Sequence, residues 1–391
     1  MRIETLALSW AEIVAQPGLP VARDQGPDFL AVHFDPDVEI GVLRERAAAI
    51  GTGAVHGGTS CLGAISAGGI SNPADKTVGL FAIWDADGDY GTACAPFSDD
   101  PKAASADAAL RALQAAGRPG EAPSMVWLSS SPGVEEAVLA GIESVVGRDV
   151  PIVGGSAADN DISGNWAVFD QAQQSSEGVV VSVLFPSTDT AISFQSGYAP
   201  TDRSAIVTRA KGRRIYELDG MPAVDVYNGW TDDCLGPRQQ GPWQVLSSST
   251  FSPLGRKVDA VSDVPYFLLV HPATAHPDGS IDVFADIVVG ERLHLMTGSP
   301  DTLVARAGRV AQQSREELGG GRDIAGALVV YCAGCMLAVR DRMDEVAEGV
   351  DRGLLSAPFL GIFTFGEQGS VIGGGSRHGN LMISCVTFAA S

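Results

Sequence analysis

The residues best suited to chemistry gather near the end of the chain, in a glycine-rich segment between two apolar runs. Glu367, Arg377 and His378 stand between the runs at 359–364 and 381–388. Apolar runs rich in aromatic and branched residues on either side of such a segment predict strand, loop and strand. Because glycine lacks a Cβ, this loop can bring backbone N–H groups and charged side chains close to a small ligand. The alternative is a glycine-rich hairpin whose charged side chains face solvent.

A single Cys-x-x-Cys pair, Cys332 and Cys335, stands at a predicted strand end just ahead of a predicted helix. The N–H groups at a helix N-terminus can lower a thiol pKa, so the pair suggests a redox role or half of a metal site. A structural zinc site needs four ligands, and no second pair supplies them. We expect all six cysteines to be reduced, buried thiols, the other four being Cys61, Cys94, Cys234 and Cys385.

Acid–base chemistry is a third possibility, because Asp159, Glu367 and His378 could meet across two halves of the chain. No Gly-x-Ser-x-Gly nucleophile elbow occurs among the many serines. Because this nucleophile motif is absent, we expect these three residues to bind a polar ligand rather than to catalyse a reaction. Of the six histidines, only His378 lies in the glycine-rich segment.

Composition and charge exclude several classes of partner. The chain has 391 residues, 45% of them hydrophobic, and a formal net charge of −21. Such acidity repels phosphate backbones and anionic membranes, so nucleic acid and lipid surfaces are poor partners. No apolar run approaches the length of about 18 residues that a membrane-spanning helix needs. The first residues lack the pattern of a signal peptide, and we expect a cytoplasmic protein.

The elements that would position these residues follow a repeated order. Segments 125–185 and 327–388 share strand, small-residue turn, helix, strand, glycine-rich loop and returning strand, at an offset of about 200 residues. The strands at 78–84 and 90–96 are joined by Asp85–Asp89, a turn of hairpin type. Residues 228–265, rich in Gly, Pro, Ser and Asp, look like a surface excursion.

We therefore predict a mixed α/β fold with two pseudo-repeated halves, in which mixed sheets are flanked by helices. The predicted division is a lead-in segment at 1–27, an N-terminal domain at 28–205 and a C-terminal domain at 215–391. Two related α/β halves usually place a ligand at their junction, where the loops after the strands converge.

For this ligand site we assign Arg377 to a carboxylate and Glu367 or Asp159 to an amine or hydroxyl, with His378 and Cys332 nearby. Backbone N–H groups would hold an anionic or carbonyl group. The residues that would supply them are Gly58, Thr59, Gly154, Gly155, Gly373 and Gly374.

Five stretches together resemble the FIST proteins, with N-terminal and C-terminal FIST parts covering about residues 28–385. The most specific are the run Glu-Leu-Asp-Gly-Met-Pro-Ala and the run Phe-Thr-Phe-Gly-Glu. The stretches are Gly58–Ile65, Val153–Asp159, Tyr216–Tyr227, Tyr331–Gly334 and Gly361–Gly369. The chain departs from the family pattern at Cys61, Ala64, Cys335 and Gly379.

The resemblance implies an intracellular sensory module for a small ligand, with amino acids or related metabolites as the proposed class. In some members it implies a haem-binding sensor of nitric oxide, although we expect no cofactor here. It also implies that a signal passes to a separate protein, because the chain shows no output domain of its own. An enzyme acting on a small metabolite through Cys332, His378 and Glu367 remains the alternative. The sequence leaves any metal and the oligomeric state open.

Overall fold

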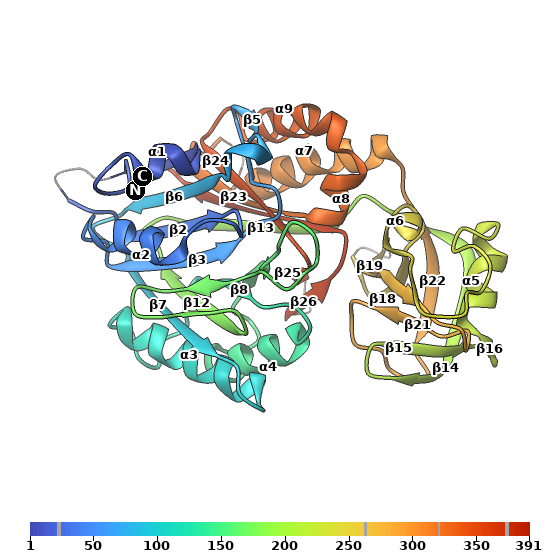
Figure 1. Cartoon of the computed structure of the whole chain (residues 1–391). Helices are drawn as coiled ribbons and strands as arrows, with labels where there is room; N and C mark the ends of the chain where they lie inside the picture. The colour runs from blue at the N-terminus through green and yellow to red at the C-terminus, as the bar shows by residue number, and fades with distance from the viewer. Residues whose placement is uncertain (22–24, 262–263, 320, 372–374) are drawn as a thin grey trace.

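Two parts of unequal size make up the structure, a computed structural model that describes residues 1–21, 25–261, 264–319, 321–371 and 375–391. The larger part, here called the body, consists of residues 1–196 and 300–391. The smaller part, here called the sheet module, consists of residues 199–297 and stands to one side of the body (Figure 1).

The body repeats one arrangement of strands three times within the described residues. Each unit has two parallel strands joined by a helical crossover, a returning antiparallel strand, and a fourth strand antiparallel to the returning one. Parallel neighbours need such a crossover because a tight turn can join only antiparallel strands.

The first unit comprises β1 (Arg2–Leu8), α1 (Trp10–Val14), β2 (Phe29–Phe34), α2 (Ile40–Ala48), β3 (Ala54–Thr59) and β6 (Val78–Trp84). The second comprises β7 (Asp89–Pro96), α3 (Pro101–Ala115), β8 (Met125–Ser130), α4 (Glu135–Val146), β9 (Ile152–Ser156) and β12 (Gly178–Phe185). The third comprises β13 (Thr190–Ser196), α7 (Pro300–Glu317), β23 (Ile324–Cys332), α8 (Ala333–Ala338), α9 (Met343–Gly353), β24 (Phe359–Thr364) and β27 (Met382–Ala389).

Local sequence explains why these elements form. The parallel strands are short runs of apolar residues buried along their whole length, such as β2 and β24, as expected for strands covered on both faces. The helices that precede them begin at polar caps, with Ser9 before α1, Asp100 before α3 and Ser299 before α7. Each cap accepts a hydrogen bond from a backbone N–H of the first turn, which would otherwise lack a partner.

The three units are joined by a cyclic exchange of short hairpins. In each unit a short hairpin follows the second parallel strand. This hairpin pairs with the second parallel strand of a neighbouring unit. The hairpins are β4 (Ala64–Ser66) with β5 (Gly69–Ile70) on β24, β10 (Val168–Phe169) with β11 (Gln174–Ser175) on β3, and β25 (Glu367–Val371) with β26 (Gly375–Gly379) on β9.

A ring of three backbone hydrogen bonds closes the same cycle at the carboxyl ends of the parallel strands. In each unit one N–H donates to a carbonyl of the neighbouring unit over 3.1 Å. The pairs, donor first, are Cys61 with Phe363, Phe365 with Ser156, and Ala158 with Thr59. The strand ends of all three units therefore meet at one place.

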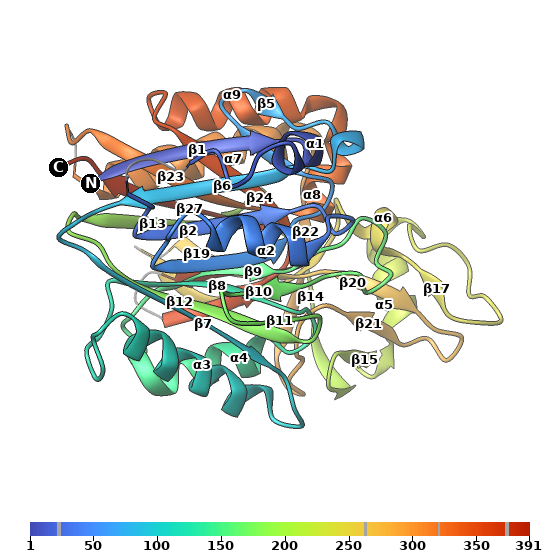
Figure 2. The ribbon, with the colours of Figure 1, turned by 60° about the vertical axis from the view of Figure 1, so that its left-hand side comes forward.

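The core of the body lies between the three sheets. Phe29, Trp127, Leu328 and Phe388, from all three units, belong to one buried cluster. Helices α7 and α9 cover one outer side and α3 and α4 the opposite side (Figure 2). None of the helices in the described residues is long and apolar enough to cross a membrane.

The predicted mixed α/β class and the repeat of 125–185 in 327–388 are confirmed, and residues 29–84 add a third copy. The predicted hairpin at 78–96 is wrong. Strand β6 belongs to the first sheet and β7 to the second, so the turn between them passes the chain from one sheet to the other. The buried Asp85 carboxylate stabilises this turn, because it accepts bonds from Tyr90 and Ser187.

The sheet module is built on a nine-stranded sheet with its own core around Leu218, Tyr227 and Val270. Residues 228–265, interpreted from the sequence as a surface excursion, supply β17, α6 and β18 to it. Its strands and helices are β14 (Ala199–Lys211), β15 (Arg214–Leu218), β16 (Met221–Pro222), α5 (Ala223–Thr231), β17 (Trp243–Gln244), α6 (Leu246–Ser249), β18 (Leu254–Val261), β19 (Val264–Val270), β20 (Pro272–Ala275), β21 (Ile281–Val283) and β22 (Arg292–Thr297).

The chain crosses between body and module twice, and the two crossings lie against each other. The first runs through Gly197 and Tyr198, and the second through Gly298 and Ser299. A Cβ on Gly298 would lie 2.6 Å from the Tyr198 ring, so only glycine allows this close approach. Elsewhere in the described residues, the two parts meet only through contacts between side chains and backbone of separate segments.

Candidate functional site

A cavity of about 300 Å³, here called the interface cavity, lies between the strand ends of the body and the sheet module. Helix α8 of the body faces α6 of the module (Figure 1), and residues of both helices line the cavity. The body contributes residues from each of its three units, among them Cys61, Asp159 and Cys332, and the module contributes residues that include Leu246, His271 and Phe284. The cavity therefore has walls from both parts.

The loop after β9 forms one side of the cavity mouth and is organised by Asp159. Its carboxylate accepts the backbone N–H groups of Ile162, Gly164 and Asn165 at 2.6, 2.7 and 2.9 Å. Ile162 has a φ of 61°, an unfavourable conformation for a branched side chain, and remains 55% exposed. Leu337 of α8, 47% exposed, also lines the cavity. Two exposed apolar side chains thus border the mouth.

Asparagines hold the walls together and use their amide groups to do so. Asn160 accepts the N–H of Leu62 at 2.7 Å and donates to Asp35 at 3.0 Å. Asn380 accepts the N–H of His271 at 3.1 Å and donates to the Phe284 carbonyl at 3.5 Å. The second asparagine therefore ties the body directly to the module wall of the cavity.

Behind the cavity lies a buried carboxyl group, that of Glu367, beside the Cys332 thiol. It accepts bonds from the Thr364 hydroxyl and the Met382 N–H, each at 2.9 Å. Burial raises the pKa of Glu367 well above its ordinary value, which favours the protonated form of the carboxyl group. The neighbouring Cys335 thiol, together with burial, likewise raises the pKa of Cys332.

The thiols of this site are consequently not thiolates. Burial raises the pKa of Cys61 to about 12, and all six cysteines are free, as predicted. Protonated thiols are poor nucleophiles and poor metal ligands. Within the part of the chain that the structure describes, no three His, Cys, Asp or Glu side chains form a cluster suited to a metal ion.

The predicted glycine N–H groups lie in sheets rather than at the cavity. Gly58 and Thr59 end β3, where the Thr59 N–H donates to the Ala167 carbonyl at 3.0 Å. Gly154 and Gly155 pair with β25, and a Cβ on Gly155 would lie 2.3 Å from Thr364. These glycines allow neighbouring units to pack closely. Gly373 and Gly374 lie outside the described residues.

Arg377 and His378 lie on opposite faces of β26, because successive side chains alternate along a strand. Arg377 is exposed, with its guanidinium on the Ser376 carbonyl at 2.9 Å, and it does not line the interface cavity. His378 is buried, with Nε2 3.1 Å from the Phe284 carbonyl. The structure thus brings Asp159, Cys332 and Glu367 to the cavity or its wall and places Arg377 elsewhere.

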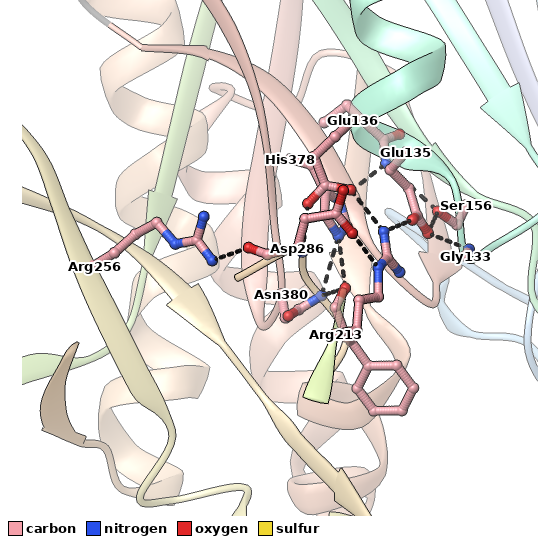
Figure 3. Close-up of polar contacts among 11 residues, drawn as sticks. Gly133, Glu135, Glu136, Ser156, Arg213, Arg256, Asp286, His378 and Asn380 are labelled. Atoms are coloured by element: carbon pink, nitrogen blue, oxygen red, sulfur yellow. Dashed lines mark hydrogen bonds and ion pairs between the residues drawn. The ribbon is translucent and has the colours of Figure 1, made fainter. Parts of the chain in front are cut away.

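A network of charges here called the clasp joins the two parts beside the cavity (Figure 3). Arg213 of the module reaches Glu135 at 2.7 Å, Glu136 at 2.6 Å and Asp286 at 3.0 Å. Glu135 also accepts the Ser156 hydroxyl at 2.8 Å. Burial alone would raise the pKa of Glu135. The electrostatic interactions with His378 and Arg213 outweigh burial and lower the pKa of Glu135 to about 2. The clasp is therefore ionised near neutral pH.

Two family models match this chain. The FIST N domain matches residues 38–221, and the FIST C domain matches residues 223–370. The chain belongs to the FIST family. FIST domains are sensory domains for small ligands, which agrees with a cavity between two jointed parts.

Two individual proteins are similar to this FIST chain. An uncharacterized protein of Methanocaldococcus jannaschii is 31% identical over 133 residues, which are 34% of this chain and 24% of that protein. The chain thus matches about a quarter of the length of that curated relative. A cyanuric acid hydrolase from A. caulinodans aligns over 100% of this chain and 99% of its own, at 9% identity and a TM-score of 0.36. A likeness of that size carries no argument about function.

Haem, which the resemblance implies for some FIST members, needs an unengaged imidazole nitrogen facing an apolar slot. His271 is the histidine at the interface cavity, and its Nε2 lies 3.1 Å from the Leu246 carbonyl. His378 Nε2 is engaged by Phe284. In this arrangement neither residue fits a haem through Nε2.

Sequence reasoning missed the module wall of the FIST site, above all His271 and Phe284. His271 was visible as a polar residue at the end of the apolar run 266–270, directly before Pro272. A polar side chain at a buried strand end is a usable signal for a site. Its partner surface could not be found, because it comes from α8 and the loop after β9, far away in sequence.

Proposed function

We propose that this FIST chain is a receptor for a small metabolite that binds in the interface cavity, between the body and the sheet module. The observation that carries the proposal is the cavity itself. It has about 300 Å³ of space, walls from both parts, and two exposed apolar side chains, Ile162 and Leu337, at its mouth. Ligand pockets commonly lie between domains and are mainly apolar with a few placed polar groups.

Binding would link the ligand to the position of the module. The parts are joined by two adjacent crossings through Gly197 and Gly298, and the ligand would touch both walls. A ligand shifts an equilibrium only through contacts that differ between two states. A ligand held between the walls makes contacts that an open arrangement would lose, so it favours the closed one. A separate protein would then read the position of the module.

Amino acids and related metabolites are the ligand class that the family resemblance implies. The predicted carboxylate partner Arg377 does not line the cavity, and none of the described lining residues is Lys or Arg. An amino acid bound here would leave its carboxylate without a guanidinium. The lining therefore supports a related metabolite without a carboxylate better than it supports an amino acid.

The geometry supports binding over catalysis by Cys332, His378 and Glu367. The pKa values of Cys332 and Glu367 are both raised by their surroundings, which disfavours the thiolate and the carboxylate. His378 faces the Phe284 carbonyl and the Gln368 side chain, so it is not engaged with the thiol as a base. An activated nucleophile needs such a base within hydrogen-bond reach.

The test combines native mass spectrometry of the purified chain with thermal-shift measurements over a metabolite collection. Leu337→Trp fills the mouth at an exposed position, so it should abolish the shift of every true ligand. Leu355→Trp makes the same substitution at a leucine that is 72% exposed and lies outside the cavity, and it should leave these shifts unchanged. Ligand shifts that survive in Leu337→Trp would overturn the proposed site.

A further inference from the structure

The interface cavity is unsuited to a charged ligand. Both Asp159 oxygens already accept N–H groups within their own loop, so an ammonium group would share Asp159 with these donors and would meet the other carboxylate, Asp161, at the exposed rim. A carboxylate or phosphate would face Asp159 and Asp161 without any Lys or Arg among the described lining residues. Burying an unpaired charge costs far more than burying a neutral group.

The walls offer mainly apolar contact and room for one ring system. Phe284, Phe365, Ile162 and Leu337 supply large apolar surfaces. The Phe284 ring lies 6.1 Å from the His271 ring at an interplanar angle of 53°, an arrangement in which flat groups can stack or meet edge to face. An apolar cavity of about 150 Å³ holds benzene. A space of about 300 Å³ therefore accommodates a single or fused pair of rings.

Among the buried polar side chains that line the cavity in the described residues, one nitrogen has no partner, and it is Nδ1 of His271. The ring is 3% exposed, and burial lowers the pKa of His271 to about 4, so it is neutral near neutral pH. Nε2 lies 3.1 Å from the Leu246 carbonyl, which can only accept, so Nε2 carries the hydrogen. Nδ1 is then a lone-pair acceptor.

No described residue donates a hydrogen bond to Nδ1, and it is not one of the fully enclosed atoms without a partner. The other buried polar groups of the lining are engaged. Asn160 and Asn380 hold neighbouring backbone and side chains, and Thr364 donates to Glu367. A ligand hydrogen-bond donor that reaches the buried part of this cavity thus finds His271 Nδ1 as a free acceptor.

From these observations we propose that the interface cavity takes a neutral, compact, ring-containing molecule with one N–H or O–H donor, the class of indoles and phenols, and that His271 Nδ1 accepts its hydrogen bond. The inference rests on the proposed function, because it assigns the ligand class of the same site. His271 is in this view the residue that sets specificity, while the apolar walls supply most of the affinity.

Isothermal titration of the full chain near neutral pH tests this with four probes. Indole should bind. Benzofuran, which has the same shape without the N–H, should bind about five- to tenfold more weakly, because one neutral hydrogen bond is lost. Indole-3-acetate and tryptophan should not bind, because each brings a carboxylate that the lining leaves unpaired.

A matched pair of variants locates the acceptor. His271→Phe should bring the affinities for indole and benzofuran together, and His294→Phe, a histidine of the same sheet outside the cavity, should keep the wild-type ratio. If His271→Phe fails to fold, the ratio of the indole and benzofuran affinities of the wild-type chain still tests whether the ligand donates a hydrogen bond.

Equal affinity for indole and benzofuran, or no binding of indole, would overturn the ligand class. The titrations also separate this inference from the proposed function. If tryptophan binds and Leu337→Trp abolishes its binding, the site stands and the neutral class is wrong. If a probe binds and Leu337→Trp leaves its affinity unchanged, the site itself is wrong, and both proposals fail.

Discussion

Two buried carboxyl groups at the boundary between body and module behave in opposite ways. Glu135 in the clasp is 2% exposed and Glu367 behind the cavity is 0% exposed, yet the pKa of the first falls to about 2 and that of the second rises. Burial raises both. The difference lies in the neighbours, because Arg213 and His378 surround Glu135, whereas thiols and neutral donors surround Glu367.

The contrast shows how one boundary can both orient the module and bind a ligand. The clasp is ionised and directional, so it can fix how the module sits on the body. At the interface cavity the pKa values of Glu367 and Cys332 are raised and the Asp159 carboxylate is bonded within its own loop, so a neutral ligand needs no counter-charge there. Substitutions in the clasp and at the interface cavity should therefore have different effects.

The largest expected effect comes from removing the cation of the clasp. Arg213→Ala leaves the buried Glu135 carboxylate without its ion pair, which should cost about 3 kcal/mol of unfolding free energy, at the lower end for a broken buried pair. Urea unfolding measures it. Arg214→Ala, which removes a more exposed pair with Asp282, should cost no more than about 1 kcal/mol. Equal losses would refute a special role for the clasp.

Neutral replacement of the two carboxyl groups should separate them. Glu135→Gln removes charge from hydrogen bonds to Arg213 and should destabilise by about 2 kcal/mol. Glu367→Gln resembles the protonated acid already present, so its effect should stay within about 1 kcal/mol. The same unfolding experiment compares them, and a larger loss in Glu367→Gln would show that Glu367 is ionised.

The pH dependence should have opposite signs in the two variants. The pKa of Glu135 lies below its ordinary 4.5 in the folded chain, so its stabilisation is present above pH 4.5 and lost as the pH falls through about 2. The raised pKa of Glu367 contributes stability below pH 4.5 that is lost as the pH rises through its folded-state value.

Relative to wild type, Glu135→Gln should therefore recover as the pH falls below 4.5, and Glu367→Gln should gain as the pH rises above it. Urea midpoints measured across this range give both slopes. Parallel slopes would mean that the two carboxyl groups share one ionisation state.

The smallest effect concerns the cavity mouth. Ile162→Gly removes the strain of a branched residue at positive φ, so stability should rise by less than about 1 kcal/mol, while ligand affinity should fall because apolar contact is lost. Leu355→Gly is the matched control, since Leu355 has a φ of 55° and lies outside the cavity. It should show the same small gain in melting temperature with unchanged affinity.

Much of the fold could be predicted from the sequence because it depends on local patterns. Short buried apolar runs and capped helices indicated the strands and crossovers, and the repeat of 125–185 in 327–388 followed from their order. The third copy at 29–84 stayed hidden, because its turn residues differ from those of the other two copies. The turn at Asp85–Asp89 looked like a hairpin because turn chemistry does not reveal which sheet each strand joins.

By itself the sequence determined the α/β class, the family and the position of Cys332 at a strand end, and it predicted free thiols. Only the tertiary structure decided which side chains at the boundary between body and module favour their charged forms. Arg377 and His378 are neighbours in sequence, but strand alternation separates them, and His271 reaches the cavity from a different part of the chain. Protonation follows the same rule, because burial and neighbouring charge depend on chain segments that come together only on folding.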